Sequence, residues 1–306
     1  MTASPAPSGF QQRIQGEWVG RPSLFDAEGA WLGFEDIRRS SVFDNGTTTY
    51  YMNGGLTGGG PLAARFTLGA PFAFGVLDSD VDRIYTGPDF YGSGQPYGAF
   101  VDAHYYGPGW QVSLNTWNHT IGDTQVYSSV LHQGPALIGV FNGVYTRDPE
   151  LVEQRIETET RCGPAPFILP TKDDCRYRGE LEVWSAAQKP LGNTTITLDI
   201  APLSLLTAEH GILLSGALDS DVRATVRRDG PRSFHEGPDV WGNATAFGRA
   251  NYPRLHLTDG RRLLGREFMI DARPGMGAGA TLAVVYQLFE HNRLTAVLHG
   301  IMERER

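Results

Sequence analysis

One stretch of this sequence occurs twice: GVLDSDV at residues 75–81 returns as GALDSDV at residues 216–222. The residues that follow also return, because GPDFYG at 87–92 is matched by GPDVWG at 237–242. Similarity repeated over such a long distance is typical of a chain built from copies of one structural unit. The stretch therefore indicates a duplicated fold, and the rest of the chain divides around it.

The C-terminal part of the unit repeats as well. Residues 130–147 align without a gap on residues 287–304, which pairs Leu131 with Leu288. The separation between matching stretches grows along the chain from 141 to 150 to 157 residues, as loop insertions in the second copy would produce. The match is good from the Asp-Ser-Asp stretch onward and poor before it, so the first third of the second copy is the hardest part to divide.

Length and composition favour two β domains. A chain of 306 residues suits two domains of about 150 residues each, and each can bury its own core. The 38 glycines, 19 prolines and 11% aromatic residues are typical of many short strands joined by tight turns. The predicted fold class is all-β, with two tandem antiparallel β-barrels that arose by internal duplication.

The strand pattern sets the expected boundaries. Short alternating segments recur at regular spacing, and the stretch 78–96, rich in glycine, proline and aspartate, is expected to be a long loop inside the first barrel. The expected division is a disordered N-terminus at 1–9, a first barrel at 10–147, a connector at 148–177 and a second barrel at 178–306.

The net charge and the targeting signals limit the classes of binding partner and the expected location of the protein. The net charge of -8 and a pI near 5.5 disfavour nucleic acid, which selects a basic surface. We find neither the pattern of a signal peptide nor an apolar run long enough to span a membrane, so a cytoplasmic protein is expected. Cys162 and Cys175 fall in the connector. Two free thiols are expected there, with a disulfide as the alternative.

Candidate catalytic residues come from strand faces, because alternate residues of a strand point the same way. Asp102 and His104 share a face of one strand, and His119 shares a face of the next. Asn142 and His299 are polar residues at matching places in the two copies, on otherwise aliphatic faces. Histidine and aspartate can act as acid or base. The candidate catalytic residues are His104, Asp102, His119 and His299, and a core hydrogen bond is the alternative role for each.

Candidate ligand-binding residues come from the aromatic residues. Tyrosine and tryptophan crowd the first copy, and ligand cavities are mostly apolar with a few placed polar groups. A cavity in the first barrel, or at its junction with the second, is therefore expected. The candidate ligand-binding residues are Tyr51, Tyr106, Asn115, Trp117, Tyr127 and Asn142.

Named catalytic and metal motifs are missing from the sequence. We find no Gly-x-Ser-x-Gly, no His-Glu-x-x-His and no dinucleotide fingerprint; His235-Glu236 lacks the second histidine. The aspartate-rich stretch that begins at Asp78 lacks the glycine and glutamate of a calcium loop. Asp78 and Asp219 are therefore expected to accept backbone hydrogen bonds at turns. No metal site and no cofactor are expected.

The entry to the first unit carries a resemblance. A helical turn at residues 10–15 is followed by Gly16-Glu-Trp18, and this resembles the entry of a lipocalin barrel. With the short strands and the duplication, the chain resembles two-domain lipocalin-like (calycin-type) proteins, among them carotenoid-hydratase-like proteins and lipocalin-like natural-product cyclases. The resemblance implies a hydrophobic small-molecule ligand, no organic cofactor, and hydration, elimination, isomerisation or cyclisation chemistry. No catalytic residue carries over from it.

Two functions are consistent with these observations. The first is a cofactor-independent lyase, isomerase or cyclase that restrains a hydrophobic molecule in a barrel cavity and moves protons on it. The second is a carrier for the same kind of molecule, and a purely structural role is a third possibility. An enzyme places an ionisable group against its ligand, whereas a carrier can use aromatic and amide groups alone. The substrate and the oligomeric state stay open.

Overall fold

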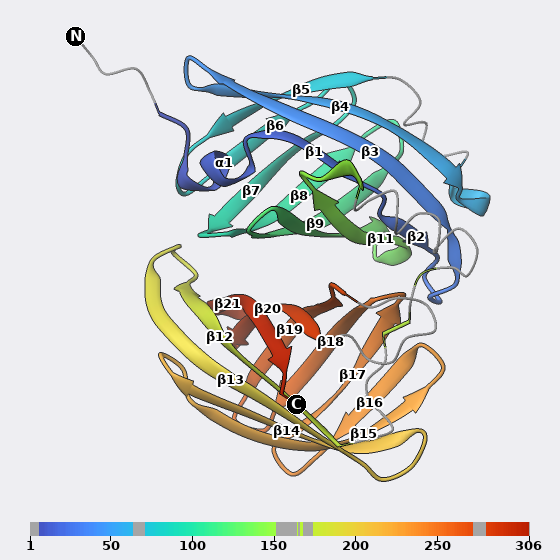
Figure 1. Cartoon of the computed structure of the whole chain (residues 1–306), viewed down its shortest axis with the longest axis vertical. Helices are drawn as coiled ribbons and strands as arrows, with labels where there is room; N and C mark the ends of the chain where they lie inside the picture. Colours follow the sequence, from blue (N-terminus) through green and yellow to red (C-terminus); the bar gives the residue numbers. More distant parts are fainter. Residues whose placement is uncertain are drawn as a thin grey trace. The chain divides into compact units, whose positions relative to one another are not determined.

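The structure, a computed structural model, describes residues 6–63, 71–150, 164, 166–167, 174–271 and 280–305. The chain divides into two compact units, Met1–Arg161 and Cys162–Arg306. Each unit is a closed antiparallel β-barrel (Figure 1). The prediction of two tandem all-β barrels is confirmed. Cys162 and most of the expected connector lie outside the described residues.

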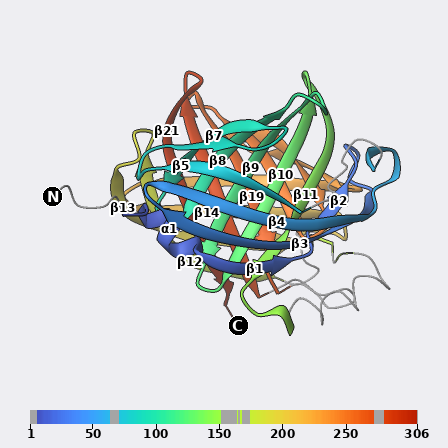
Figure 2. The same cartoon turned by 90° about the horizontal axis from the view of Figure 1, so that it is seen from above.

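The first barrel has ten strand positions. Strands β1 and β2 both pair with β3 and β11, so together they form one interrupted strand. The interruption contains Pro22, which has no backbone N–H to give to a sheet. Strands β3 and β4 are the longest, and they run alongside each other (Figure 2). The elements are α1 (Gly9–Ile14), β1 (Gly16–Gly20), β2 (Ser23–Phe25), β3 (Trp31–Asp44), β4 (Thr47–Gly58), the 3-10 turn η1 (Gly60–Leu62), β5 (Phe72–Asp78), β6 (Arg83–Thr86), β7 (Tyr91–Tyr97), β8 (Phe100–Gly107), β9 (Val112–Ile121), β10 (Thr124–Gln133) and β11 (Ala136–Thr146).

The second barrel is a simpler meander. Its strands pair in sequence order, and β21 closes the barrel on β12. Its core is mostly aliphatic and includes Leu181, Leu282 and Met302. The strands are β12 (Cys175–Ser185), β13 (Pro190–Pro202), β14 (Thr207–Gly216), β15 (Ser220–Asp229), β16 (Arg232–Glu236), β17 (Val240–Phe247), β18 (Ala250–Leu257), β19 (Arg261–Met269), β20 (Thr281–Glu290) and β21 (Arg293–Arg304).

Two of the repeated stretches occupy equivalent places in the barrels. The Gly-Pro-Asp turns join β6 to β7 and β16 to β17, the fifth and sixth strand positions of each unit. Both turns close with the same hydrogen bond, from Gly87 N to Phe90 O at 2.9 Å and from Gly237 N to Val240 O at 2.8 Å. The last two strands also correspond, because each pair carries a register shift at the same aligned position, after Leu131 and after Leu288.

The Asp-Ser-Asp stretches, in contrast, lie in different hairpins. Residues 75–81 end β5 and enter the turn to β6, whereas residues 216–222 end β14 and begin β15. These are the fourth and third strand positions of their barrels. The match between them is therefore local, and the first step in the separation between copies does not record an inserted loop. The expected loop at 78–96 was also wrong, because β6 and β7 lie within it.

Helix α1 lies at one end of the first barrel (Figure 1). The Ser8 side chain caps it by accepting from Gln11 N, and Phe10 and Ile14 are buried in the barrel core. The Trp18 indole then donates to Ile14 O at 2.9 Å. The predicted helical turn and the Gly-x-Trp opening of the first strand are confirmed.

Candidate functional site

The first barrel encloses a cavity of about 200 Å³. Most of its wall is apolar, made by phenylalanines of β5 and by aliphatic side chains of β3, β8, β9 and β10. Five tyrosines of the described chain add their rings: Tyr50, Tyr85, Tyr105, Tyr127 and Tyr145. Burial raises the pKa of Tyr105 and of Tyr145 well above the usual value, so both phenols are neutral. The cavity thus suits a hydrophobic, ring-sized molecule.

A buried polar cluster lies at the helix end of this cavity. Arg83 forms an ion pair with Asp78, and both side chains are almost fully buried. The Arg83 guanidinium also donates to Gln11 Oε1 at 3.0 Å and to the Tyr50 hydroxyl at 2.9 Å, and Tyr50 donates to Gln11 at 2.7 Å. Asp78 in turn accepts from Ser8 N at 2.9 Å. The cluster ties α1 to the barrel, and its members are committed to one another.

The expected roles of Asp78 and Asp219 agree with these contacts. Asp219 accepts from Gly216 N at 3.0 Å within its own turn. The backbone donor to Asp78 comes from the cap of α1, 70 positions away in the sequence. Asp80 accepts from Gly9 N in the same way, at 2.9 Å. In the first barrel, the acidic turn therefore anchors the helix.

Glu35 is an ionisable group for which the described part of this barrel supplies no hydrogen-bond partner. It lies on β3, with Ile37 and Arg39, in the row of residues that faces the cavity, and the side chain is 6% exposed. Its carboxyl makes no hydrogen bond to the described residues. Burial, reinforced by the nearby charge of Asp36, raises its pKa from 4.5 to about 8. Glu35 is therefore a neutral carboxylic acid at pH 7.

The strand geometry keeps Glu35 away from the nearest cation on its own face. Arg39 is four residues further along β3, about 13 Å at ~3.3 Å per residue. Arg39 instead donates to Gln125 Oε1 at 2.9 Å and packs over the Tyr145 ring at 5.1 Å. Its Nε atom is buried and has no hydrogen-bond partner among the described residues. The cavity thus presents a neutral acid and a free N–H donor on one strand.

Space beside the Glu35 carboxyl comes from a glycine on the neighbouring strand. Gly54 on β4 lies opposite Ile37, and a Cβ added to it would stand 3.3 Å from Glu35 Oε1 and 3.0 Å from Asp36 O. On the other side of β3, Glu35 N donates to Pro22 O at 2.9 Å, where the β1–β2 strand is interrupted. Backbone of β4 therefore lies close to Glu35 on one side, and backbone of the segment between β1 and β2 lies close to it on the other.

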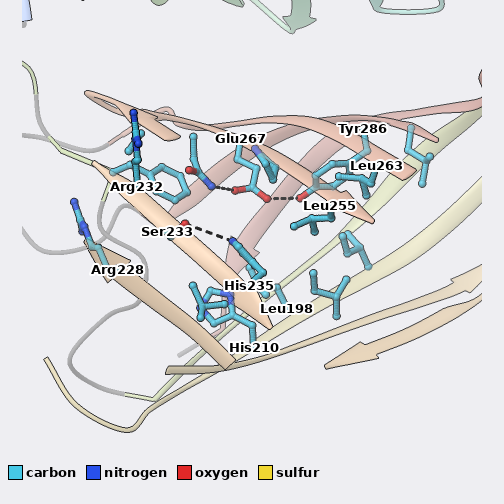
Figure 3. Close-up of a pocket in the computed structure, with 18 of the residues that line it drawn as sticks. Leu198, His210, Arg228, Arg232, Ser233, His235, Leu255, Leu263, Glu267 and Tyr286 are labelled. Atoms are coloured by element: carbon cyan, nitrogen blue, oxygen red, sulfur yellow. Dashed lines mark hydrogen bonds between the residues drawn. The ribbon is translucent and has the colours of Figure 1, made fainter. Parts of the chain in front are cut away.

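The second barrel has a smaller cavity of about 70 Å³. It holds a buried carboxyl of the opposite kind, because Glu267 accepts from Asn251 Nδ2 and from the Tyr286 hydroxyl, each at 2.8 Å (Figure 3). Burial raises the pKa of Glu267, while these two hydrogen bonds act to lower it. Unlike Glu35, this carboxyl has partners within the protein.

Three of the residues predicted from the sequence lie together on the first barrel. Asn115 Nδ2 donates to Asp102 Oδ1 at 2.7 Å, and His104 Nε2 lies 3.3 Å from the same oxygen. The His104 side chain is 65% exposed. Asp102 and His104 alternate with the cavity-lining Val101 and Tyr105 along β8, and Asn115 lies between the cavity-lining Leu114 and Thr116 on β9. All three therefore point away from the cavity.

The other predicted residues follow the same rule, with one exception. Tyr127 lines the cavity and contacts the Tyr145 ring at 5.2 Å. The others lie outside the lining of both barrel cavities: Tyr51 and Tyr106 are exposed, whereas Trp117, His119, Asn142 and His299 are buried on the opposite strand faces. The structure does not test their predicted roles, which stay predictions.

The sequence reasoning missed Glu35, Arg39 and His210. Both faces of β3 carry charged residues, so alternation there cannot say which face is inside. His210 had a usable signal, because it stands between Ala208 and Ile212 on an apolar face of β14, the same pattern that singled out His299. In the described part of the chain, no three His, Cys, Asp or Glu residues are placed to hold a metal ion. No described helix is long and apolar enough to cross a membrane.

Comparisons with known proteins support the fold alone. No family model matches the chain, and no curated protein matches it. A protein of unknown function from the DUF3598 family of Nostoc punctiforme is 11% identical, with a TM-score of 0.62 over 97% of this chain and 98% of that chain. The structure of EF1p2_mFAP2b bound to DFHBI is 10% identical, with a TM-score of 0.28 over 47% of this chain and 100% of that chain. The first similarity supports the tandem-barrel architecture and does not extend to the hydratase and cyclase families.

Proposed function

We propose that the first barrel binds a hydrophobic small molecule and that Glu35 exchanges a proton with it. The protein is then a cofactor-independent enzyme of the lyase, isomerase or cyclase class. One observation carries this proposal: a carboxylic acid that burial keeps neutral lies in the wall of an apolar cavity without a hydrogen-bond partner. A strongly perturbed group in a cavity is a functional-site candidate, because catalytic acids need a pKa near the working pH.

The chemistry follows from the groups around the acid. A neutral Glu35 can protonate a carbonyl, hydroxyl or alkene of the bound molecule, and the resulting carboxylate can then remove a proton from a neighbouring carbon. The faces of the tyrosine rings stabilise positive charge that forms on the substrate. The apolar walls exclude water and hold one conformation of the substrate. Arg39 Nε offers a donor for an electronegative atom at the far end of the strand.

A carrier function is the alternative, and one observation favours it. The cluster of Arg83, Tyr50 and Gln11 is satisfied internally, so most of the polar wall is inert. In a carrier, Glu35 only donates a hydrogen bond to the ligand and the proton does not leave. The two functions therefore differ in whether proton transfer occurs.

Binding is tested with N-phenylnaphthylamine, an uncharged dye that becomes fluorescent in apolar surroundings. We expect saturable binding at one site. Binding should be lost in Leu114→Trp, because the larger side chain extends from the wall and fills the cavity. The matched control is Leu263→Trp in the wall of the second cavity, which should leave dye binding unchanged.

Proton transfer is tested with nitrobenzisoxazole, a planar apolar molecule with one acidic C–H. A carboxylate base takes that proton, the electrons of the C–H bond form a nitrile, and the N–O bond breaks to release a coloured phenolate. We expect a rate that rises with pH through about 8, where Glu35 ionises. The rate should fall at least about a hundredfold in Glu35→Gln, as general base catalysis contributes roughly that much or more.

Glu267→Gln is the matched control, because Glu267 is also a buried carboxyl but has partners. It should keep the full rate. Dye binding without elimination, or elimination that Glu35→Gln retains, would favour the carrier. The same assay applied to His104→Ala and His299→Ala tests the residues predicted from the sequence.

A further inference from the structure

The second barrel places two histidines in the wall of its own cavity (Figure 3). His210 lies on β14 and His235 on β16, and both strands pair with β15. Their ring centroids are 6.1 Å apart, and the ring planes are nearly perpendicular at 87°. The two imidazoles therefore form one polar spot on the cavity wall.

His210 has an unmet hydrogen-bonding requirement. It is 8% exposed, and its buried Nε2 atom has no hydrogen-bond partner among the described residues. His235 differs, because its Nε2 lies 3.4 Å from Ser233 Oγ. A buried polar atom without a partner costs free energy. A ligand that reaches His210 would remove that cost.

Both imidazoles are neutral. Burial, followed by the neighbouring His235, lowers the pKa of His210 to about 3, and burial lowers the pKa of His235 to about 4. A neutral imidazole offers one N–H donor and one nitrogen acceptor. The wall therefore suits a neutral ligand that can donate or accept one hydrogen bond.

The rest of the cavity sets the size and shape of that ligand. Its volume of about 70 Å³ is several times the ~15 Å³ that one water requires. Figure 3 shows Leu255 and Leu263 on one side of His235, with Arg228 and Arg232 on the other. Arg228 Nε already donates to Gly230 O at 3.0 Å. The cavity therefore has room for one small ring, which would contact the leucine side chains of its wall.

We propose that the second barrel binds a small neutral aromatic alcohol of the phenol class. Its ring lies among Leu198, Leu255 and Leu263, and its hydroxyl forms a hydrogen bond with the His210 imidazole. Glu267 and Tyr286 are already bonded to each other, whereas His210 Nε2 is a buried atom of the described lining that has no hydrogen-bond partner there. A metal ion fits less well, because the described residues supply no third ligand.

Phenol and toluene are the probes, because they differ in the hydroxyl that His210 would bind. The full chain is used with Leu114→Trp, which fills the first cavity, so that the second cavity alone is measured. Calorimetry should then show saturable phenol binding at one site, with toluene about tenfold weaker, as loss of one buried hydrogen bond predicts. Nitrogen NMR of the histidine side chains should place the largest phenol-induced shifts at His210 and His235.

Substitutions then locate the site. His210→Leu should bring phenol affinity down to that of toluene and leave toluene binding in place. The matched control His256→Leu, whose ring stacks on Trp241 at 4.4 Å outside the cavity, should leave both affinities unchanged. The proposal is overturned if phenol and toluene bind equally when Leu114→Trp fills the first cavity. It is also overturned by histidine shifts absent from His210, or if adding His210→Leu leaves phenol binding as before. If His210→Leu does not fold, the first two measurements decide.

Discussion

Each barrel has ten strand positions, but the two cavities contain ionisable groups of opposite kinds. The first holds an acid, Glu35, whose pKa burial raises to about 8. The second holds two bases, His210 and His235, whose pKa values burial lowers to about 3 and 4. In each case the apolar interior removes the charge, because desolvation disfavours whichever form is ionised. Barrels of the same strand number therefore keep an acid neutral in one case and two bases neutral in the other at pH 7.

The comparison teaches that strand order does not determine the chemistry of the interior. The Gly-Pro-Asp turn and the shifted register of the last two strands are common to both barrels. Helix α1 and the cluster of Arg83, Asp78, Tyr50 and Gln11 belong to the first barrel. The two interiors carry different ionisable side chains, so the two barrels should also respond differently to pH and to substitution.

The largest effect should come from breaking the Arg83 cluster. Arg83→Met leaves Asp78 buried without its cation, which should lower the free energy of unfolding by about 3–5 kcal/mol. The loss should fall on the first barrel and release α1. Urea unfolding followed by tryptophan fluorescence measures it. Arg176→Met in the second barrel breaks an exposed pair with Asp199, and its stability should stay unchanged; equal losses in the two variants would contradict the burial argument.

The pH dependence of the first barrel follows from Glu35. Its folded pKa of about 8 exceeds the unfolded value of 4.5, so the folded state binds more protons in that window. The stability that Glu35 contributes is full below pH 4.5 and is lost as the pH rises through 8. We expect a loss on the order of 3 kcal/mol in the native protein that is absent in Glu35→Gln. Parallel stability curves for the two proteins would refute this assignment.

The second barrel should show the opposite trend. The folded pKa of His210, about 3, lies below the unfolded value of 6.5. The unfolded state therefore binds more protons, and stability that is full above pH 6.5 is lost as the pH falls toward 3. The effect should be on the order of 2 kcal/mol, since part of the shift depends on His235. His210→Leu should reduce this loss and leave the part that comes from His235, whose pKa burial lowers to about 4. A variant as acid-sensitive as the native protein would be inconsistent with a neutral imidazole at position 210.

The smallest effect should come from Gly54→Ala. The added Cβ would stand 3.3 Å from Glu35 Oε1 and would crowd the carboxyl without filling the cavity. We expect a few-fold loss of dye affinity and of elimination rate, with little change in stability. Gly75→Ala is the control on the adjacent strand, because nothing lies within 4 Å of its added Cβ. Identical behaviour of the two variants would show that Gly54 has no role in the site.

The fold was largely predictable from the sequence. Short alternating segments and the duplication gave two antiparallel barrels, and the Gly16-Glu-Trp18 entry was placed correctly. The hairpin correspondence was not predictable, because Asp-Ser-Asp suits many turns and occurs here at different strand positions. Strands β6 and β7 escaped notice since glycine and proline, which usually mark loops, lie within and between them.

The site was harder to predict because alternation does not say which face is inside. On β8, Val101 and Ala103 on one face and Asp102 on the other are all buried, so burial leaves no contrast in the sequence. On β9, the inward residues Thr116 and Asn118 are polar, which reverses the usual rule. The large outward residues therefore looked like a cavity wall. Only the three-dimensional closure of the barrel shows that Glu35 faces the cavity.

The protonation state of Glu35 tests the central claim most directly. Carbon NMR of glutamate labelled at the side-chain carboxyl, with Glu35→Gln to identify its signal, gives the pKa of this group in the folded protein. The structure predicts a midpoint near 8 that moves when N-phenylnaphthylamine occupies the cavity. A midpoint near the ordinary 4.5, unaffected by the dye, would show a solvated carboxylate and would contradict the proposed site.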